Sequence, residues 1–375
     1  DMVSRGLGDV YKRQEEVFKL VFAKEAGEKI DMNHYDQVIA DAVQSVVRKQ
    51  TDVGVDVVSD GEQSKISYAT YIKHRLNGFE GDSPRRTPKD LEEYPAFSKR
   101  ASSSGGVPTY SRPQCVGPIS VKDLKPLEVD LQNFKDALSA SESTDAFMNA
   151  ASPGVIAQFQ PNQHYPDHSS YLYALADAMK VEYEGIAEAG LVIQIDSPDL
   201  ALGRHVLFKD QSDEEFVAMA ELHIEALNHA LQNIPAEQLR LHVCWGNYQG
   251  PHHCDIEMKK ILPAVLKAKP MALSFEGANP RHSHEWSVFR DAKIPENKVL
   301  IPGVLDSTTN FVEHPELVAE RICRFADIVG RERVIAGSDC GFSTFAGFGT
   351  VDADITYAKL GSLVRGAEIA SERLW

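Results

Sequence analysis

The chain alternates short apolar runs with longer helical patterns, and this alternation restricts the fold more than any other feature of the sequence. Runs that are almost continuously apolar are typical of parallel strands buried on both faces of a sheet. Strand–helix alternation predicts an α/β fold with a parallel sheet. We expect strands within seven segments: 53–62, 154–161, 191–198, 240–247, 272–279, 299–306 and 333–340.

The segments between these runs carry helix start and stop signals. Ser212 precedes two acidic residues, which is typical of a helix N-cap followed by a first turn that complements the helix dipole. Gly190 closes an earlier helical pattern, as glycine commonly does at helix C-termini. We expect helices over four segments: 171–190, 212–234, 314–330 and 351–371.

The distribution of polar residues favours a closed barrel over an open sheet. Polar side chains recur at the ends of the expected strands along the whole chain, whereas an open doubly wound sheet gathers them at one switch point. A (βα)8 barrel of the TIM type needs eight strands, and seven are counted. We therefore predict such a barrel, with its first strand missing or replaced by a non-native N-terminal segment.

Residues 1–14 do not share the pattern of the rest of the chain. The stretch DMVSRGLGDVYKRQ has no sustained period of 2 or 3.6 and resembles read-through of a sequencing adaptor. We interpret it as non-native and expect native sequence to begin near Glu15, within a helix. A barrel without its first strand exposes two unpaired edges, so we expect poor solubility that restoring the strand would relieve.

Residues 15–375 are expected to form one domain with a single long excursion. The alternation breaks over residues 79–120, where Pro, Ser, Gly and charged residues dominate, and residues 111–120 read as a short hairpin strand at its end. Loops of this length inside a compact domain are usually functional or mobile.

Charge and cysteine content exclude several classes of partner and compartment. The formal net charge is −16, which argues against nucleic acid and anionic membranes as partners. No apolar run approaches the roughly 20 residues of a membrane helix, and the N-terminus lacks a signal core. The five cysteines are irregularly spaced, which in a reducing compartment favours metal or catalytic roles over disulfides. We therefore expect a cytoplasmic protein.

Four residues at the ends of expected strands form a set of metal ligands: His242, Cys244, Glu276 and Cys340. His242 and Cys244 are two apart on one strand, so both side chains face the same way. Two sulfurs, one imidazole and one carboxylate suit tetrahedral zinc. Functional groups of parallel barrels collect at the C-terminal strand ends. The domain of residues 15–375 is thus expected to be a zinc-binding β/α barrel.

Zinc in this setting favours activation of a thiol, because coordination strongly depresses a thiol pKa and leaves a nucleophilic sulfur. The alternative for each buried cysteine is simple packing, which we assign to Cys323 within an amphipathic helix. A rival ligand cluster, in a loop, is His252, His253 and Cys254.

The ligand set resembles the zinc-binding C-terminal domain of cobalamin-independent methionine synthase, a family that includes related single-domain thiol alkyltransferases. The shared features are H-x-C, a Glu after the next strand and DCG at the last strand, and the likeness extends from about residue 15 to 371. RPQCVGPI resembles the inserted hairpin of that family. The resemblance implies Zn²⁺ held by all four ligands.

Two acidic residues are assigned roles by the same resemblance. VVSDGEQSK and IQIDSPDL resemble segments whose acids contact the homocysteine amino group, which implies that role for Glu62 and Asp196. The alternative for both is a helix N-cap in a βα loop.

The chain departs from the family where a catalytic histidine is expected. GVLDSTTNFVEHP places Ser307, Thr308 and Thr309 at that position, and His314 lies too far along. The general acid–base role therefore has no obvious carrier. The family's duplicated N-terminal domain and first-strand motif are also missing from this sequence.

We predict zinc-dependent transfer of a methyl group to homocysteine, as in methionine biosynthesis, with methyltetrahydrofolate or a methyl-corrinoid protein as donor. One alternative resembles the epoxyalkane:coenzyme M transferases, whose thiol carries a sulfonate. Asp196 and Glu62 disfavour a sulfonate, whereas three basic residues near zinc would favour it: Arg204, His205 and Arg281. The others are a non-catalytic zinc-binding barrel and the decarboxylase relatives, which share only the fold.

Overall fold

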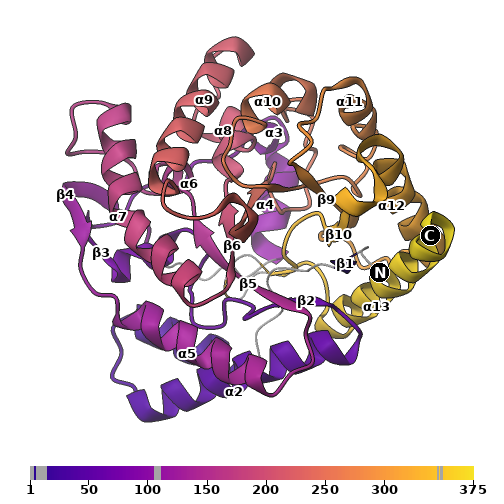
Figure 1. The fold of residues 1–375 in the computed structure, drawn as a ribbon. Coiled ribbons are helices and arrows are strands. Elements are labelled where there is room, and N and C mark those ends of the chain that lie inside the picture. Colours follow the sequence, from indigo (N-terminus) through magenta and orange to yellow (C-terminus); the bar gives the residue numbers. More distant parts are fainter. Residues whose placement is uncertain (1–3, 6–14, 105–110, 344–345, 347–348) are drawn as a thin grey trace.

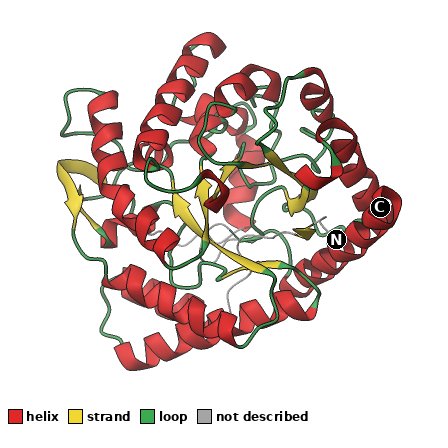
Figure 2. Cartoon of the chain, in the orientation of Figure 1, coloured by secondary structure: helices red, strands yellow, loops and turns green. Residues whose placement is uncertain are grey.

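The computed structural model describes residues 4–5, 15–104, 111–343, 346 and 349–375 (Figure 1). An 8-stranded parallel sheet runs in the order β1-β10-β9-β8-β7-β6-β5-β2. The sheet curls in the middle of the molecule and helices surround it (Figure 2). Its strands are β1 Ser4–Arg5, β2 Val57–Ser59, β5 Asp145–Ala151, β6 Val192–Asp196, β7 Leu239–Val243, β8 Ala272–Phe275, β9 Val299–Leu305 and β10 Ile335–Ser338.

Helices follow the strands along the chain and bury their apolar faces against the sheet or one another. The longer ones are α1 Glu15–Glu25, α2 Met32–Asp52, α5 Lys125–Ser139, α7 His168–Glu188, α9 Asp213–Ala230, α12 Pro315–Val329 and α13 Ala353–Leu374. The shorter ones are α6 Pro153–Phe159, α8 Gly203–Val206, α10 Met258–Val265, α11 Trp286–Asp291 and the 3-10 turns η1 Thr70–His74, η2 Pro198–Leu200, η3 Ala236–Gln238 and η4 Arg331–Arg333. The four expected helices correspond to α7, α9, α12 and α13.

The start of α9 shows how local sequence sets a helix boundary. The Ser212 hydroxyl accepts a hydrogen bond from the Glu215 N–H, and the Glu215 carboxylate accepts one from the Ser212 N–H. This reciprocal capping box satisfies two backbone donors that a helix start leaves free. Ser212 is therefore the N-cap that the sequence predicts.

One expected strand is wrong. Segment 154–161 lies mostly in the helix α6, and the strand of this unit is β5, which precedes it. Ser152 caps the helix by accepting from the Val155 N–H, and Pro153 occupies the first helical position. A short apolar run does not distinguish a buried helix from a strand by periodicity. Asn149 interrupts the apolar pattern of β5, which hid that strand.

The N-terminal segment contributes a strand at one end of the sheet. Ser4–Arg5 forms β1 and pairs in parallel with β10, opposite Ile335 and Ala336. The remainder of the stretch interpreted as non-native lies outside the described residues. β1 and β2 are the two ends of the strand order, and the expectation that the native first strand is missing stays a prediction.

The excursion over residues 79–120 begins and ends in an antiparallel pair of strands, β3 Leu76–Glu80 and β4 Gln114–Val121. The pair lies beside α7 at the outer edge of the molecule (Figure 1). Two short helices, α3 Lys89–Glu92 and α4 Pro95–Ser104, lie between the strands in sequence. Within the described part of the chain, no helix is both long and apolar enough to cross a membrane.

Candidate metal centre

Three of the four expected metal ligands converge at the C-terminal ends of β7 and β10. One ligand atom from each of His242, Cys244 and Cys340 lies within 4.8 Å of the other two, and all three side chains are buried. The two sulfurs are 3.1 Å apart. His242 is the second-last residue of β7, Cys244 follows that strand directly, and Cys340 lies two residues after the end of β10. The curl of the sheet brings these strand ends together although two strands separate them in the strand order.

The protonation states of this group fit a metal. Burial lowers the pKa of His242 to about 3, so its imidazole is neutral and keeps a lone pair for coordination. Its Nδ1 lies 3.2 Å from the Ser274 hydroxyl, which orients the ring. Burial is the main cause that raises the pKa of Cys340 far above its usual range. For Cys244, the Cys340 hydrogen bond lowers the pKa, whereas burial and Glu276 raise it, with a net rise. Two buried thiols beside a neutral imidazole are donors that zinc deprotonates on binding.

Glu276 lies beside this group and not within it. Its Oε1 accepts a hydrogen bond of 2.7 Å from the Trp245 N–H and lies 3.7 Å from Cys340 Sγ. Its Oε2 accepts one of 2.8 Å from the side-chain amide of Asn279. The carboxylate thus contacts a sulfur of the group and is held by two donors at the end of β8.

Asp339 is a further candidate site residue that the sequence did not indicate. Its carboxylate accepts three backbone hydrogen bonds of 2.7–2.8 Å from Gly277, Ala278 and Asn279. It thereby holds the loop that carries Glu276 next to Cys340. Burial, followed by the nearby Glu276, raises the pKa of Asp339 to about 7. Its place directly before Cys340 at a strand end was the available signal.

Asp196 lies in the same region of the sheet. It ends β6 and is the register partner of His242 on β7. Its carboxylate accepts hydrogen bonds from the side-chain amides of Asn149, at 3.0 Å, and Gln194, at 2.9 Å. The acid is therefore fixed in orientation beside the ligand group.

Glu62 belongs to a buried ion pair that the sequence did not predict. Its Oε1 lies 3.0 Å from Lys65 Nζ, and both side chains are almost fully buried. Lys65 also donates to the Asn149 carbonyl at 2.7 Å, so Asn149 links Glu62 and Asp196 in one network. The backbone of Glu62 has φ +51°, a left-handed conformation that is unusual for glutamate and is often retained at functional sites.

The loop after β9 brings no histidine to the site. Ser307 donates to the Asn247 side chain, and Thr308 and Thr309 donate to Asp306. His314 is the N-cap of α12, where its Nδ1 accepts from the Glu316 N–H. The side chains at the end of β9 are therefore hydroxyls, and His314 serves to cap α12.

A cavity of about 590 Å³ opens beside Glu276. Tyr94 and Phe97 of the excursion line one part of it, and His252 and Arg281 line another. The other two basic residues considered for a sulfonate do not line this cavity. Arg204 pairs with Asp213, and His205 is buried against Asp255. Of these three basic residues, Arg281 is the one that lines this cavity.

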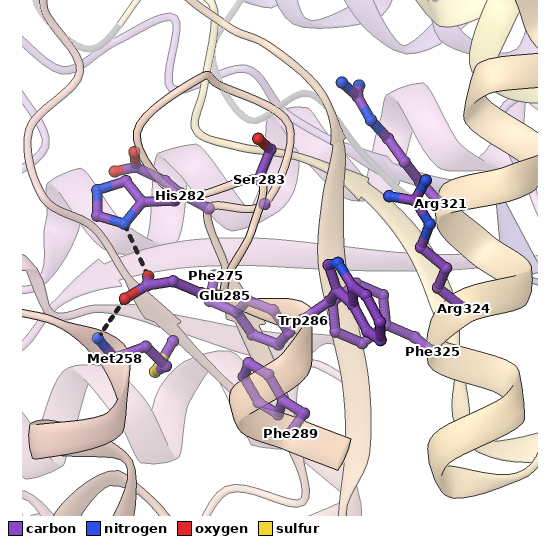
Figure 3. Close-up of a pocket in the computed structure, with 12 residues that line it drawn as sticks. Met258, Phe275, His282, Ser283, Glu285, Trp286, Phe289, Arg321, Arg324 and Phe325 are labelled. Atoms are coloured by element: carbon purple, nitrogen blue, oxygen red, sulfur yellow. Dashed lines mark hydrogen bonds and ion pairs between the residues drawn. The ribbon is translucent and has the colours of Figure 1, made fainter. Parts of the chain in front are cut away.

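A second buried network includes His282 and Glu285 (Figure 3), which line a small pocket together with Glu276. His282 bonds Glu285 through Nδ1 and Asp255 through Nε2, and Glu285 also accepts from the Met258 N–H. Burial lowers and the two carboxylates raise the pKa of His282, with a net value of about 10. His252 shares Asp255, at 2.9 Å. These charges hold the loops that flank the cavity.

The rival cluster is only partly assembled. His253 and Cys254 lie near Glu93 of the excursion, whereas the His252 ring points to Asp255 and the Tyr248 carbonyl.

Comparison with protein families gives one match that covers more than half of the chain. The family described as "Cobalamin-independent synthase, Catalytic domain" matches residues 155–367. The matched span contains all four expected metal ligands and Asp196.

Individual relatives and solved structures agree with that match. Over 351 residues the chain is 26% identical to a methionine synthase of Saccharolobus solfataricus, covering 92% of this chain and 88% of the relative. It is 25% identical to a methionine synthase of Sulfurisphaera tokodaii, covering 97% and 91%. A B12-independent methionine synthase from Shewanella sp. W3-18-1, solved with selenomethionine, has a TM-score of 0.70 at 20% identity over 92% of both chains. A putative vitamin-B12 independent methionine synthase from Listeria monocytogenes has a TM-score of 0.64 at 18% identity, over 98% of this chain and 99% of that one.

Proposed function

The chain belongs to the cobalamin-independent methionine synthase family, and from that premise we propose that it is a zinc-dependent methyltransferase that methylates the thiol of homocysteine. The observation that carries the proposal is the convergence of His242, Cys244 and Cys340 within 4.8 Å at two strand ends. The cavity beside Glu276, whose carboxylate lies 3.7 Å from Cys340 Sγ, favours catalysis over a purely metal-storing barrel, because it leaves room for a substrate.

We propose that His242, Cys244, Cys340 and Glu276 hold the zinc. When bound, zinc would lower the pKa of the substrate thiol, so that a nucleophilic thiolate forms near neutral pH. We expect Glu276 to be the ligand that the substrate thiol displaces. Its carboxylate already accepts hydrogen bonds from the Trp245 N–H and the Asn279 side chain, and these would hold it when it leaves the metal.

The acids of the neighbouring strand ends would orient the amino acid. We assign Asp196 and Glu62 to the substrate ammonium. Asn149 fixes the position of both acids: its side-chain amide donates to Asp196, and its carbonyl accepts from Lys65, which pairs with Glu62. Holding the thiol and the methyl carbon in one geometry contributes roughly 7–11 kcal/mol to lowering such barriers.

The cavity beside Glu276 is the proposed place of the methyl donor. Methyltetrahydrofolate and a methyl-corrinoid protein are the two donors we consider. Tyr94 and Phe97 offer aromatic surface to a flat pterin ring, which favours the folate.

We further propose that the curled sheet is a (βα)8 barrel. We also place the reaction in the cytoplasm, where a reducing environment keeps Cys244 and Cys340 as free thiols.

A second candidate function is alkylation of a thiol that carries a sulfonate, as in coenzyme M. Arg281 lines the cavity beside Glu276 and would pair with such a group. Asp196 and Glu62 oppose it, which makes homocysteine the preferred thiol.

The test measures metal content and then thiol binding. The purified protein is loaded with zinc, and homocysteine and coenzyme M are titrated separately while proton release and zinc–sulfur absorption are followed. We expect an additional sulfur with homocysteine and, with a methyl donor present, formation of methionine. An additional sulfur with coenzyme M alone would move the assignment to the second candidate.

Cys340→Ser is the informative variant, and Cys323→Ser is its control. Cys323 is half-buried on α12, and its thiol belongs to neither group of candidate ligands. We expect Cys340→Ser to lower methyl transfer more than about 100-fold and to weaken zinc binding, with Cys323→Ser close to the parent protein. Full activity in Cys340→Ser would refute the proposal.

A further inference from the structure

A second group of potential ligands lies at the rim of the cavity. Glu93 follows α3 in the excursion, and His253 and Cys254 lie in the loop between β7 and α10. One ligand atom from each of the three lies within 4.8 Å of the other two. The excursion and the loop are separated by about 160 residues, so this contact is a tertiary junction between two distant segments. Asp90 of the excursion also joins them, because its carboxylate accepts hydrogen bonds from the Tyr248 hydroxyl and the His252 N–H.

The distances within this group are close to those of a coordination sphere. His253 Nε2 lies 2.7 Å from Glu93 Oε2, and Cys254 Sγ lies 3.9 Å from Glu93 Oε1. Donors around a four-coordinate zinc are separated by roughly 3–4 Å, given metal–ligand distances near 2.0–2.3 Å. Glu93 and His253 are exposed and Cys254 is half-buried, so small rotations of these side chains are sterically open.

The chemistry of the three donors is specific. A thiolate, an imidazole and a carboxylate form the set that borderline divalent metals prefer, whereas Ca²⁺ and Mg²⁺ prefer oxygen donors alone. The Glu93 carboxylate is already oriented toward His253, since its Oε2 lies 2.7 Å from the His253 Nε2. Three protein ligands leave a fourth position open for water.

We propose that Glu93, His253 and Cys254 bind a second divalent metal of the zinc class at the rim of the cavity. The site is distinct from the one formed by His242, Cys244 and Cys340, and it does not depend on the proposed function. Binding releases one proton, from the Cys254 thiol. The hydrogen on Nε2 of His253 moves to Nδ1, so that Nε2 coordinates the metal.

The consequence is a clamp on the cavity wall. Tyr94 directly follows Glu93, lines the cavity and contacts the His253 ring, with 5.5 Å between ring centres. His252, directly before His253, lines the cavity from the other segment. A metal joining Glu93 to His253 therefore fixes the excursion against the loop and sets the width of the opening.

The experiment counts metal ions in the whole chain. The protein is stripped with a chelator and titrated with Co²⁺, and thiolate-to-cobalt absorption is recorded together with elemental analysis. We expect two equivalents in the parent protein. Cys254→Ser and Glu93→Gln should each lose one equivalent, and Cys323→Ser, the matched control, should keep both.

Two outcomes separate this proposal from the proposed function. If Cys340→Ser loses one equivalent and Cys254→Ser binds as many as the parent, the rim site is refuted and the zinc centre stands. If Cys254→Ser loses one and Cys340→Ser none, the rim site stands and the zinc centre fails.

Hydrogen exchange provides a readout independent of metal counting. Residues 89–100 should exchange at least about 10-fold more slowly with metal than without it, because bridging restrains local opening. The same slowing in Glu93→Gln would contradict the clamp.

Discussion

A single hydroxyl supports the histidine of the candidate zinc centre. Ser274, the register partner of His242 on β8, lies 3.2 Å from its Nδ1. Partners of this kind fix the ring orientation and raise its basicity, and losing one typically weakens metal affinity 10–100-fold. We expect Ser274→Ala to weaken zinc binding by about 10-fold or more, measured by competition with a chelating dye. Ser287→Ala on α11 is the control, and equal affinities in the two variants would refute the role of Ser274.

The Glu62–Lys65 pair separates a structural role from a catalytic one. Both side chains are about 97% buried or more, and removing one partner of a buried pair typically costs about 3–5 kcal/mol because a charge remains unpaired. We expect Glu62→Gln to lower the free energy of unfolding by about 3 kcal/mol and Glu62→Gln/Lys65→Met to recover part of it. Denaturant titration gives these values.

Homocysteine turnover then distinguishes the two roles of Glu62. If Glu62 orients the substrate ammonium, kcat/KM should stay low in the double variant although stability returns. Recovery of both together would assign Glu62 to structure alone.

At the scale of elements, β9 packs against the residue before Cys340 through a glycine. A Cβ at Gly303 would lie 2.0 Å from Asp339 Oδ1 and 2.7 Å from Asp339 Cα. Because backbone atoms are involved, Gly303→Ala must shift the start of the Cys340 loop. We expect a loss of about 3 kcal/mol in stability, measured by calorimetry, together with weaker zinc binding.

Gly361→Ala on α13 is the matched control for Gly303→Ala. A Cβ at Gly361 meets nothing within 4 Å, so alanine should stabilise the helix by up to about 1 kcal/mol. Two variants of equal stability would contradict the packing argument.

The contact between α7 and α9 should make stability depend on pH. His168 Nε2 lies 2.8 Å from His223 Nε2, and His223 Nδ1 lies 2.8 Å from Asp199. Burial, then the charge of His223, lowers the pKa of His168 to about 4. The folded state thus favours neutral His168, so this contribution is present above pH 6.5 and is lost as the pH falls from 6.5 to 4.

We expect about 1–2 kcal/mol less stability at pH 5 than at pH 7 from this residue. His168→Gln should flatten the dependence, and His284→Gln, at an exposed position, should keep it. Thermal unfolding across this range tests the prediction. An unchanged slope in His168→Gln would contradict it.

For the whole molecule, the candidate zinc centre joins strands that are three positions apart in the sheet. A ligand that binds only the folded state stabilises it by about 2.7 kcal/mol at 100 times its Kd. We expect a chelator to lower Tm in the parent protein and to have a smaller effect in Cys340→Ser. Calorimetry with and without zinc measures this, and identical shifts in both proteins would place the stabilising metal elsewhere.

Features that depend on neighbours in the chain were predicted from the sequence. Ser212 caps α9 because capping needs only residues a few positions away. His242 and Cys244 face the same way because side chains alternate along a strand. The family match agrees with the resemblance that these residues indicated. The expectation of a strand over 154–161 is wrong because the four apolar residues of this run suit a buried helix as well as a strand.

What the sequence by itself determined is the kind of donor and the strand end that carries it. The tertiary structure decided which donors meet, because that depends on sheet curl and strand order, which no local pattern encodes. The curl brings Cys340 to Cys244 and places Glu276 beside them, on a loop that is hydrogen-bonded to the Asp339 carboxylate. Tertiary packing also places Glu93 beside His253 and joins Lys65, the local partner of Glu62, to the Asn149 carbonyl.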